Sequence, residues 1–460
     1  MTENRPYIKE VYHLYDVMRD TFFSKNIGFG VIRLIFLKYA SDNCLGAYTR
    51  EEMQDYIKVQ KLFAARDVGA GPNGIVPVLD LMDKHYNLGN LMHSSINEYA
   101  KELFGLDDSW NKKNTSERNF VEIMSILSSM DLTDNLETHE VGKVLVSVLV
   151  DNLQYHGENA KFASPYYSRR EIGVLANKIL NVKDNEIFLD FCSGVGTTTI
   201  TSVGYAKCKV INHDINEEAL SVASMLYIMY GYEDFVMEQK DGFPEAFSDV
   251  EEKPVFEIAD KIFVDPPLGI KIKNNPLRDS AIIALSSAAA YLKDNGTAIV
   301  AIPSSALGGM GNFAGLLREK LVGNQYVQAV IALPMAWPGT MVSMNLVVLS
   351  KRQNKGVLFV NACGNALKNI FDINERTYKR TKGNVPFSDN QLDELASIIN
   401  DGKEIDGLSR LVDLNEIVAK EYRLIPNLYV SDVIETDSVS LKEIDDELDA
   451  LYSKLIKMTI

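Results

Sequence analysis

Two hydrophobic patterns divide the chain. Residues 6–155 carry apolar positions at helical spacing, as in VYHLYDVMRDTF, GVIRLIFLKYASDN and FVEIMSILSSM, with almost no strand-like alternation. From Ile187 onward, short apolar runs alternate with segments suited to helices; the runs are IFLDF, KVINHD, KIFVD, TAIVAIP, VQAVIALP and NLVVLSK. This rhythm predicts an α/β fold, a mostly parallel sheet with helices on both faces, preceded by an all-helical domain.

The last part of the chain, from about residue 364, is polar, and its pattern predicts helices. Near its end, apolar residues recur at alternating steps of three and four, which is typical of an a/d seam: Leu441, Ile444, Leu448, Leu451, Leu455 and Met458. Such a helix can pack on its own domain or pair with a partner chain, a second copy included. We therefore expect three parts, 1–155, 156–363 and 364–460, the last for subunit contact.

Charge and composition narrow the function classes. The 460 residues hold 47 Lys plus Arg against 63 Asp plus Glu, a formal net charge of -16, which is the wrong sign for gripping a phosphate backbone alone. The four cysteines are far apart and lack the spacing of zinc ligands, so reduced thiols in the cytoplasm are expected. No apolar stretch is long enough to predict a membrane span.

The segment IFLDFCSGVGTTTI is the first candidate for cofactor binding. It puts Asp190 at the end of a predicted strand, with Gly194 and Gly196 in the turn that opens a helix, where glycine lets the backbone approach a ligand closely. Thr199 stands where a dinucleotide-binding motif has its third glycine. The D-x-x-x-G-x-G form therefore favours S-adenosylmethionine over NAD.

Two further segments follow in an order that supports the first. The run KVINHD ends in Asp214, where a carboxylate can accept both hydroxyls of a ribose. In QKDGF, Asp241 can accept from an adenine amino group, Phe243 can pack on the ring, and Gly242 lies between them. A glycine turn after a strand is common in α/β proteins, so the prediction depends on the order and spacing of all three segments.

The candidate catalytic loop is Asp265-Pro266-Pro267-Leu268, after the strand KIFVD, at the sheet edge where open α/β folds place their chemistry. Consecutive prolines fix φ and lack amide donors, so they hold the loop rigid. An exocyclic amine on a base is a poor nucleophile. A carboxylate oxygen of Asp265 and the carbonyl of Pro266 can accept both of its N–H bonds and aim the nitrogen at a methyl group.

The order of FASP, DFCSGVG and DPPLG resembles that of the gamma-type N6-adenine and N4-cytosine DNA methyltransferases. DVMRD followed by VIRLIFLKYASDN, and the late VDLNEIVAKEYRLIPNLYV, resemble segments of type I restriction-modification methyltransferase subunits, so the resemblance covers nearly the whole chain. It implies a Rossmann-like class I methyltransferase domain with a seven-stranded sheet, S-adenosylmethionine as cofactor and a flipped adenine as target. The partners it implies are DNA, a specificity subunit and a restriction subunit. The cofactor residues it implies are Phe162, Ser164, Pro165, Asp190, Gly194 and Asp214. The candidate cofactor residues from the segments above are Cys192, Gly196, Asp241, Gly242 and Phe243.

Two departures from the family pattern keep other functions open. Leu268 stands where the family has Tyr or Phe to stack on the flipped base, and Ala163 also replaces an aromatic residue. Stacking of this kind is worth about 1 to 3 kcal/mol, or roughly a factor of 5 to 160 in rate. A catalytically impaired paralogue with a structural or regulatory role is the main alternative. A methyltransferase acting on protein or RNA is a third, which the helical flanks disfavour.

Overall fold

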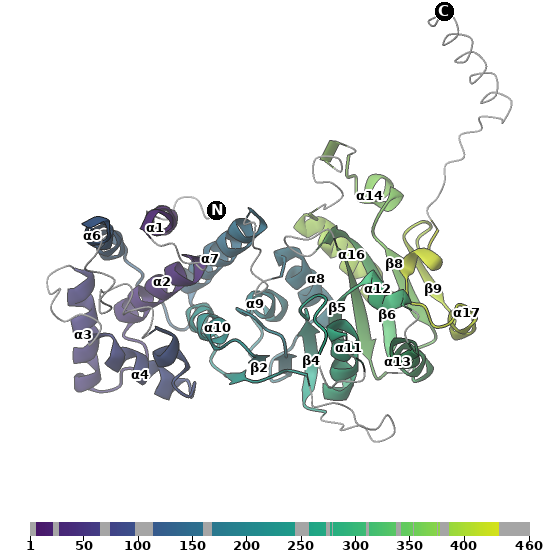
Figure 1. Cartoon of the computed structure of the whole chain (residues 1–460), viewed down its shortest axis with the longest axis horizontal. Helices are drawn as coiled ribbons and strands as arrows, with labels where there is room; N and C mark the ends of the chain where they lie inside the picture. The colour runs from purple at the N-terminus through teal and green to yellow at the C-terminus, as the bar shows by residue number, and fades with distance from the viewer. Residues whose placement is uncertain are drawn as a thin grey trace, which may run out of the picture.

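The computed structural model contains a helical part and an α/β part, which lie side by side (Figure 1). The structure describes residues 6–21, 27–64, 74–96, 114–159, 168–243, 257–272, 277, 279–309, 312–336, 342–352, 354–374, 376–377 and 386–431. The helices of the helical part are α1 (Pro6–Thr21), α2 (Ile27–Asn43), α3 (Arg50–Phe63), α4 (Val76–His85), α6 (Asn114–Ser129) and α7 (Glu140–Asn159).

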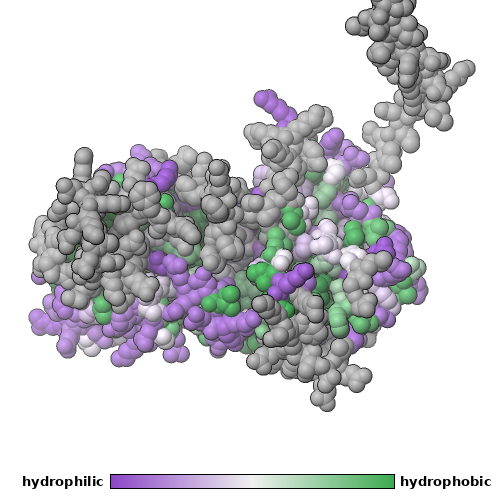
Figure 2. Space-filling view, in the orientation of Figure 1, coloured by the Kyte–Doolittle hydropathy of each residue, from purple (hydrophilic) through white to green (hydrophobic). Residues whose placement is uncertain are grey.

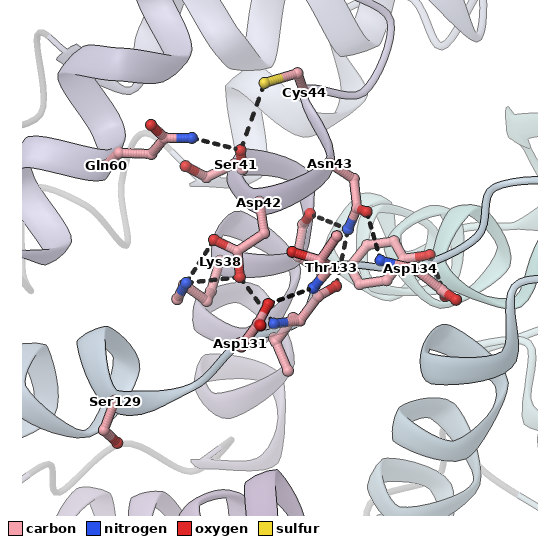
Figure 3. Close-up of polar contacts among 12 residues, drawn as sticks. Lys38, Ser41, Asp42, Asn43, Cys44, Gln60, Ser129, Asp131, Thr133 and Asp134 are labelled. Carbon is pink, nitrogen blue, oxygen red and sulfur yellow. Dashed lines mark hydrogen bonds and ion pairs between the residues drawn. The ribbon is translucent and has the colours of Figure 1, made fainter.

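Helix α2 is the centre of the helical part. Thirteen consecutive residues, Phe29–Ser41, are buried. A helix that is buried on every side must be surrounded by other elements, and α1, α3, α6 and α7 all contact it. The end of α2 is fixed by polar groups. Asn43 donates to the carbonyl of Leu132 at 2.9 Å, and Asp42 accepts from the amide of Leu132 at 2.9 Å while it pairs with Lys38 (Figure 3).

Asp134 links this network to the start of α7. Its carboxylate accepts from the amides of Val141 and Gly142, at 3.0 and 2.7 Å, and from the Tyr39 hydroxyl at 2.8 Å. The first amides of a helix have no partner inside the helix, so Asp134 satisfies two of them and holds α7 against α2.

The α/β part is built on one sheet. Its strands are β1 (Ile187–Asp190), β2 (Lys209–Asp214), β3 (Phe235–Gln239), β4 (Ala259–Val264), β5 (Leu292–Pro303), β6 (Val327–Ala336), β7 (Ser343–Ser350), β8 (Val357–Asn361) and β9 (Ser409–Val412). Within the described residues the order is β3-β2-β1-β4-β5-β7-β6-β8-β9. Strands β1 to β5 pair in parallel, and β7 runs antiparallel between β5 and β6. The mostly parallel sheet is as predicted, but among the described residues it has nine strands rather than the expected seven.

Helices cover both faces of this sheet, as the alternating segments predict. Along β5, Ile299 and Ala301 belong to one apolar cluster, whereas Ala298, Val300 and Ile302 belong to a second cluster on the opposite face. The first face is covered by α8 (Arg170–Leu180), α9 (Thr197–Val203), α10 (Glu217–Tyr230), α14 (Asn365–Asn369) and α16 (Asp389–Asp401). The second is covered by α11 (Ser280–Tyr291), α12 (Ser304–Gly308), α13 (Asn312–Gly323), α17 (Leu414–Ala419) and the 3₁₀ helix η4 (Pro426–Leu428).

The two parts share one apolar cluster, because α10 packs against α2 and α7. Arg33 of α2 pairs with Glu218 of α10 at 2.9 Å. Gly142 lies so close to α10 that a Cβ atom there would be 1.9 Å from the carbonyl oxygen of Met229. The helical part is therefore attached to the helix that follows β2, beside the predicted cofactor site.

The region after residue 363 differs from the prediction of helices alone. Strand β9 extends the sheet by pairing with β8, and α16 packs on α8. This region therefore contributes to the α/β part at least as far as β9. The predicted seam from Leu441 to Met458 lies outside the described residues.

The described surface differs between the two parts. On the face seen in Figure 2, the helical part is mainly hydrophilic, whereas apolar residues gather over the α/β part. Among the described helices, none has both the length and the apolar character needed to cross a membrane.

Candidate cofactor and catalytic site

The predicted site residues follow neighbouring parallel strands. From β1 the chain continues outward through β2 to β3, whereas β4 and β5 lie on the other side of β1. The strand order thus reverses between β1 and β4. Open α/β sheets bind ligands at such a switch point, beyond the carboxyl ends of the strands. Asp190, the last residue of β1, and Asp265, which directly follows β4, stand at this point.

The loop after β1 requires its glycines. Gly194 and Gly196 have φ values of +52° and +73°, in the left-handed region that favours glycine. A Cβ atom on Gly196 would also lie 2.5 Å from the hydroxyl oxygen of Tyr227. The Gly194 amide donates to Oδ2 of Asp214 at 2.8 Å, and the Asn216 amide donates to Oδ1 at 2.9 Å. Each carboxylate oxygen can accept a second bond, so Asp214 retains acceptor capacity for a ribose.

Thr199, the residue in place of a third glycine, holds Asp190. Its hydroxyl donates to Oδ2 of Asp190 at 3.0 Å, and the Cys192 amide donates to Oδ1 at 3.2 Å. Burial, with a smaller contribution from the charges of Asp214 and Asp265, raises the pKa of Asp190 to about 7, although the two hydrogen bonds lower it. The Asp190 carboxyl is therefore poised to change its charge near neutral pH.

The segment after β3 lies directly on the glycine loop. A Cβ atom on Gly242 would be 1.7 Å from the carbonyl oxygen of Phe191, so only glycine permits this approach. Asp241 accepts from the Phe243 amide at 3.0 Å. The Phe243 ring is 8% exposed and lies edge-on to Phe191, with centroids 6.3 Å apart. The segment is near the glycine loop as expected, while contact of Asp241 and Phe243 with an adenine remains a prediction.

The site is strongly acidic. Burial raises the pKa of the Cys192 thiol well above its usual value, and the charges that raise it further are those of Asp190, Asp214, Asp265 and Asp241. Four carboxyl groups from the ends of β1, β2, β3 and β4 thus lie within electrostatic range of one side chain. Such an environment attracts a cationic ligand and repels a pyrophosphate.

Side chains from outside the loop fix the candidate catalytic loop. Ser168 donates to Oδ2 of Asp265 at 2.5 Å, and Ser280, the first residue of α11, donates to the Pro267 carbonyl at 2.6 Å. Pro266 is buried, and Leu268 is partly buried and packs against the first apolar cluster. Hydrogen bonds therefore hold the loop at the Asp265 carboxylate and at the Pro267 carbonyl.

Some predicted site residues cannot be placed, and some residues at the site were not predicted. Phe162, Ser164 and Pro165 lie outside the described residues. Three residues next to the predicted acids were not predicted: Ser168, which donates to Asp265, Thr199, which donates to Asp190, and Ile215, which directly follows Asp214 and is 72% exposed. Only Ile215 had a local signal, an apolar residue next to the candidate ribose carboxylate. The bond from Ser168 joins residues 97 positions apart, and Thr199, although it lies in the glycine segment, stood out there only as the residue in place of a third glycine.

The strand order, the antiparallel β7 and the acidic glycine loop at the switch point define a Rossmann-like methyltransferase fold, which confirms the predicted fold class. A family model described as N-6 DNA Methylase matches residues 151–438, well over half of the chain. The chain belongs to the N-6 DNA methylase family.

The chain is also similar to individual proteins of type I restriction systems. The chain is 24% identical over 336 residues to the methylase subunit of the type I restriction enzyme MjaVIII of Methanocaldococcus jannaschii, covering 66% of this chain but 56% of the relative. It thus spans little more than half of that curated protein. The fold is similar to that of a type I methyltransferase subunit from Streptococcus thermophilus, with a TM-score of 0.67, 18% identity, and coverage of 92% of this chain and 99% of that one. A second similar structure comes from work on assembly and conformational transition of a type I restriction-modification system, with a TM-score of 0.62, 15% identity, and coverage of 99% and 97%.

Proposed function

We propose that this chain is the adenine-N6 DNA methyltransferase subunit of a type I restriction-modification system, and that it transfers a methyl group from S-adenosylmethionine. The observation that carries the proposal is the Asp265-Pro266-Pro267 loop next to an acidic glycine loop, at the switch point of the sheet. Family membership supports the target, and the type I relatives support the assembly.

The residues present fit S-adenosylmethionine. Bound S-adenosylmethionine supplies an electrophilic methyl group on a sulfonium, and it carries an ammonium group as well. The carboxylates of Asp190, Asp214 and Asp241 offset such positive charge, whereas they would oppose the pyrophosphate of NAD. Asp190 and the glycine loop would hold the methionine end, Asp214 the ribose, and Asp241 with Phe243 the adenine.

Asp265 and Pro266 activate the target amine in this proposal. The Asp265 carboxylate and the Pro266 carbonyl accept its two N–H bonds, which favours a tetrahedral nitrogen with its lone pair directed at the methyl group. The bond from Ser280 to the Pro267 carbonyl and the two fixed φ angles keep the loop in place while this happens. After methyl transfer the amine must lose a proton, and Asp265 is the adjacent base. The amine cannot be reached inside a stacked duplex, so the adenine is flipped out.

The net negative charge of the chain indicates that it needs partner subunits to bind DNA. A chain with a formal net charge of -16 gains little from counterion release at DNA. A separate specificity subunit therefore supplies the sequence-specific grip, and a restriction subunit supplies cleavage, in the cytoplasm. Tight, sequence-specific binding of DNA by the isolated chain at physiological salt would contradict this dependence.

The first test is calorimetric titration with S-adenosylmethionine of the wild type and of Asp214→Ala. Saturable binding that Asp214→Ala weakens is expected, while Asp294→Ala, an exposed acid at the opposite edge of the sheet, should bind like the wild type. Transfer of tritium from labelled S-adenosylmethionine to unmethylated DNA then tests catalysis, and Asp265→Ala should abolish it. A folded wild-type chain that binds no S-adenosylmethionine would contradict the proposal.

One observation favours a second function. Leu268 packs against the apolar cluster and has no ring to place against a flipped base. This supports a catalytically impaired subunit that keeps the fold for assembly or regulation. Binding of S-adenosylmethionine without methyl transfer, by the chain assembled with its specificity subunit, would select this alternative.

A further inference from the structure

We infer that Ser168 is a positioning residue for Asp265, so that the start of α8 sets the direction of the catalytic carboxylate. The inference rests on the proposed function, in which Asp265 accepts from the target amine. Its basis is the hydrogen bond of 2.5 Å from Ser168 Oγ to Asp265 Oδ2. Ser168 lies 97 residues before Asp265 and is only 8% exposed.

This bond matters because a carboxylate can rotate about its last side-chain bond. Rotation about that bond is broad and roughly two-fold, so proline residues in the backbone do not fix it. A buried donor on Oδ2 selects one orientation and thereby the direction of Oδ1. Hydrogen bonds to a charged group are stronger than those between neutral groups, which suits Ser168 to this task.

Ser168 itself stands on a rigid support. It comes two residues before α8, and a Cβ atom on Gly173 of α8 would lie 1.7 Å from the hydroxyl oxygen of Thr201 in α9. The two helices are therefore in direct contact. At its other side α8 is tied to α16, through Arg170 with Asp389 at 3.1 Å and through Lys178 with Asp393.

The same support connects the catalytic acid to the cofactor loop. Gly196, the N-cap of α9, is part of the glycine loop, and α9 carries the α8 contact one turn later. A path of packed atoms thus runs from the glycine loop through α9 and α8 to Ser168 and Asp265. This arrangement fixes the carboxylate relative to the site of the methyl donor rather than to the loop alone.

The variants Ser168→Ala and Ser168→Thr test the inference, in the chain assembled with its specificity subunit. The rate of a single turnover is measured with tritiated S-adenosylmethionine and unmethylated plasmid DNA from pH 5.5 to 8.5. We expect Ser168→Ala to lower the rate by roughly ten- to a hundredfold, since a hydrogen bond to a charged group is lost. Its affinity for S-adenosylmethionine should stay within about twofold of the wild type, because the groups of the cofactor loop are unchanged.

The pH profile separates positioning from general damage. Loss of a donor to a carboxylate raises its pKa, so the acid limb of the Ser168→Ala rate should move to higher pH. Asp190 and Cys192 also lie within electrostatic range of Asp265, and they are the same in every variant. Ser168→Thr keeps the hydroxyl and should restore most of the rate and the original limb. The control Ser224→Ala removes a buried serine bond within α10 and should leave both unchanged.

Each outcome decides the inference. A Ser168→Ala variant with the wild-type rate and pH profile overturns it while the proposed function stands. A wild type that binds S-adenosylmethionine and transfers no methyl group overturns both. If Ser168→Ala does not fold, Ser168→Cys, a weaker donor of similar size, should show the same slower rate and shifted limb, and wild-type behaviour there overturns the inference.

Discussion

Binding of S-adenosylmethionine should depend on pH through Asp190. Burial places the pKa of this carboxyl at about 7 in the free protein, so it is mostly protonated at pH 6 and mostly ionised at pH 8. A cationic ligand favours the ionised form and lowers the pKa when it binds. Binding must therefore release a proton below about pH 7. The affinity should rise as pH increases through 7 and level off above it.

The size of the effect follows from that pKa. About one tenth of the Asp190 carboxyl groups are ionised at pH 6 and about nine tenths at pH 8. If the bound form stays ionised throughout, the affinity differs by about tenfold between these values, which corresponds to about 1.4 kcal/mol. At pH 7, binding should release about half a proton per chain.

Calorimetry can measure both quantities. Titrations at pH 6, 7 and 8, each in two buffers with different ionisation enthalpies, give the affinity and the number of protons released. Asp190→Asn keeps the shape of the side chain but does not titrate, so its affinity should change with pH only through the ionisation of the ligand itself. The ammonium group of S-adenosylmethionine titrates equally with both proteins and cancels in the ratio of their affinities. A wild-type affinity that changes no more than that of Asp190→Asn would refute the assignment of this proton to Asp190.

Three further predictions concern stability and rate. Because the pKa of Asp190 is raised by folding, its contribution to stability is fully present below the unfolded value and is lost as pH rises through about 7; urea unfolding of the wild type relative to Asp190→Asn should show a decline of about 4 kcal/mol at most between pH 4 and 8, and a constant difference would contradict it. Gly142→Ala should lower the free energy of unfolding by about 1 to 3 kcal/mol, because its Cβ would meet the Met229 carbonyl, whereas Gly315→Ala in α13, with open space around it, should raise it by about 0.5 to 1 kcal/mol; equal effects in thermal unfolding would argue against a close contact at α10. Leu268→Tyr should increase methyl transfer by roughly 5- to 160-fold through stacking on the target base, and a slower rate at unchanged cofactor affinity would show that the position serves packing instead.

The fold was predictable where hydrophobic patterns are long. The strands that the sequence analysis named, β1, β2, β4, β5, β6 and β7, all form. Those that it missed have weak signals. Strand β8, VLFVN, is buried at every position, and a short continuous apolar run cannot be told from a buried helical segment by periodicity. Strands β3 and β9 have five and four residues, and both include exposed positions, which suits their places at the two edges of the sheet.

The site was predictable in its acids and glycines but not in the contacts that hold them. Asp190 and Asp214 end β1 and β2, and Asp265 directly follows β4 of the same parallel set, so strand patterns alone bring them to one edge. The bond from Ser168 to Asp265 depends instead on how α8 packs on α9, across 97 residues of sequence. Such a contact is a product of the tertiary structure and has no local pattern.

The two departures from known motifs have opposite consequences in the structure. Thr199, which breaks the dinucleotide pattern, is fully buried and donates to Asp190, so the departure itself holds the acid that a cationic cofactor needs. Leu268, which breaks the methyltransferase pattern, turns its side chain to the apolar cluster and contributes to packing. In the proposed function, Thr199 therefore supports cofactor binding through Asp190, while activation of the target amine depends on Asp265 and the groups that orient it. A decision between an active and an impaired subunit must come from measurements on Asp265, Ser168 and Leu268, because cofactor binding alone is compatible with both.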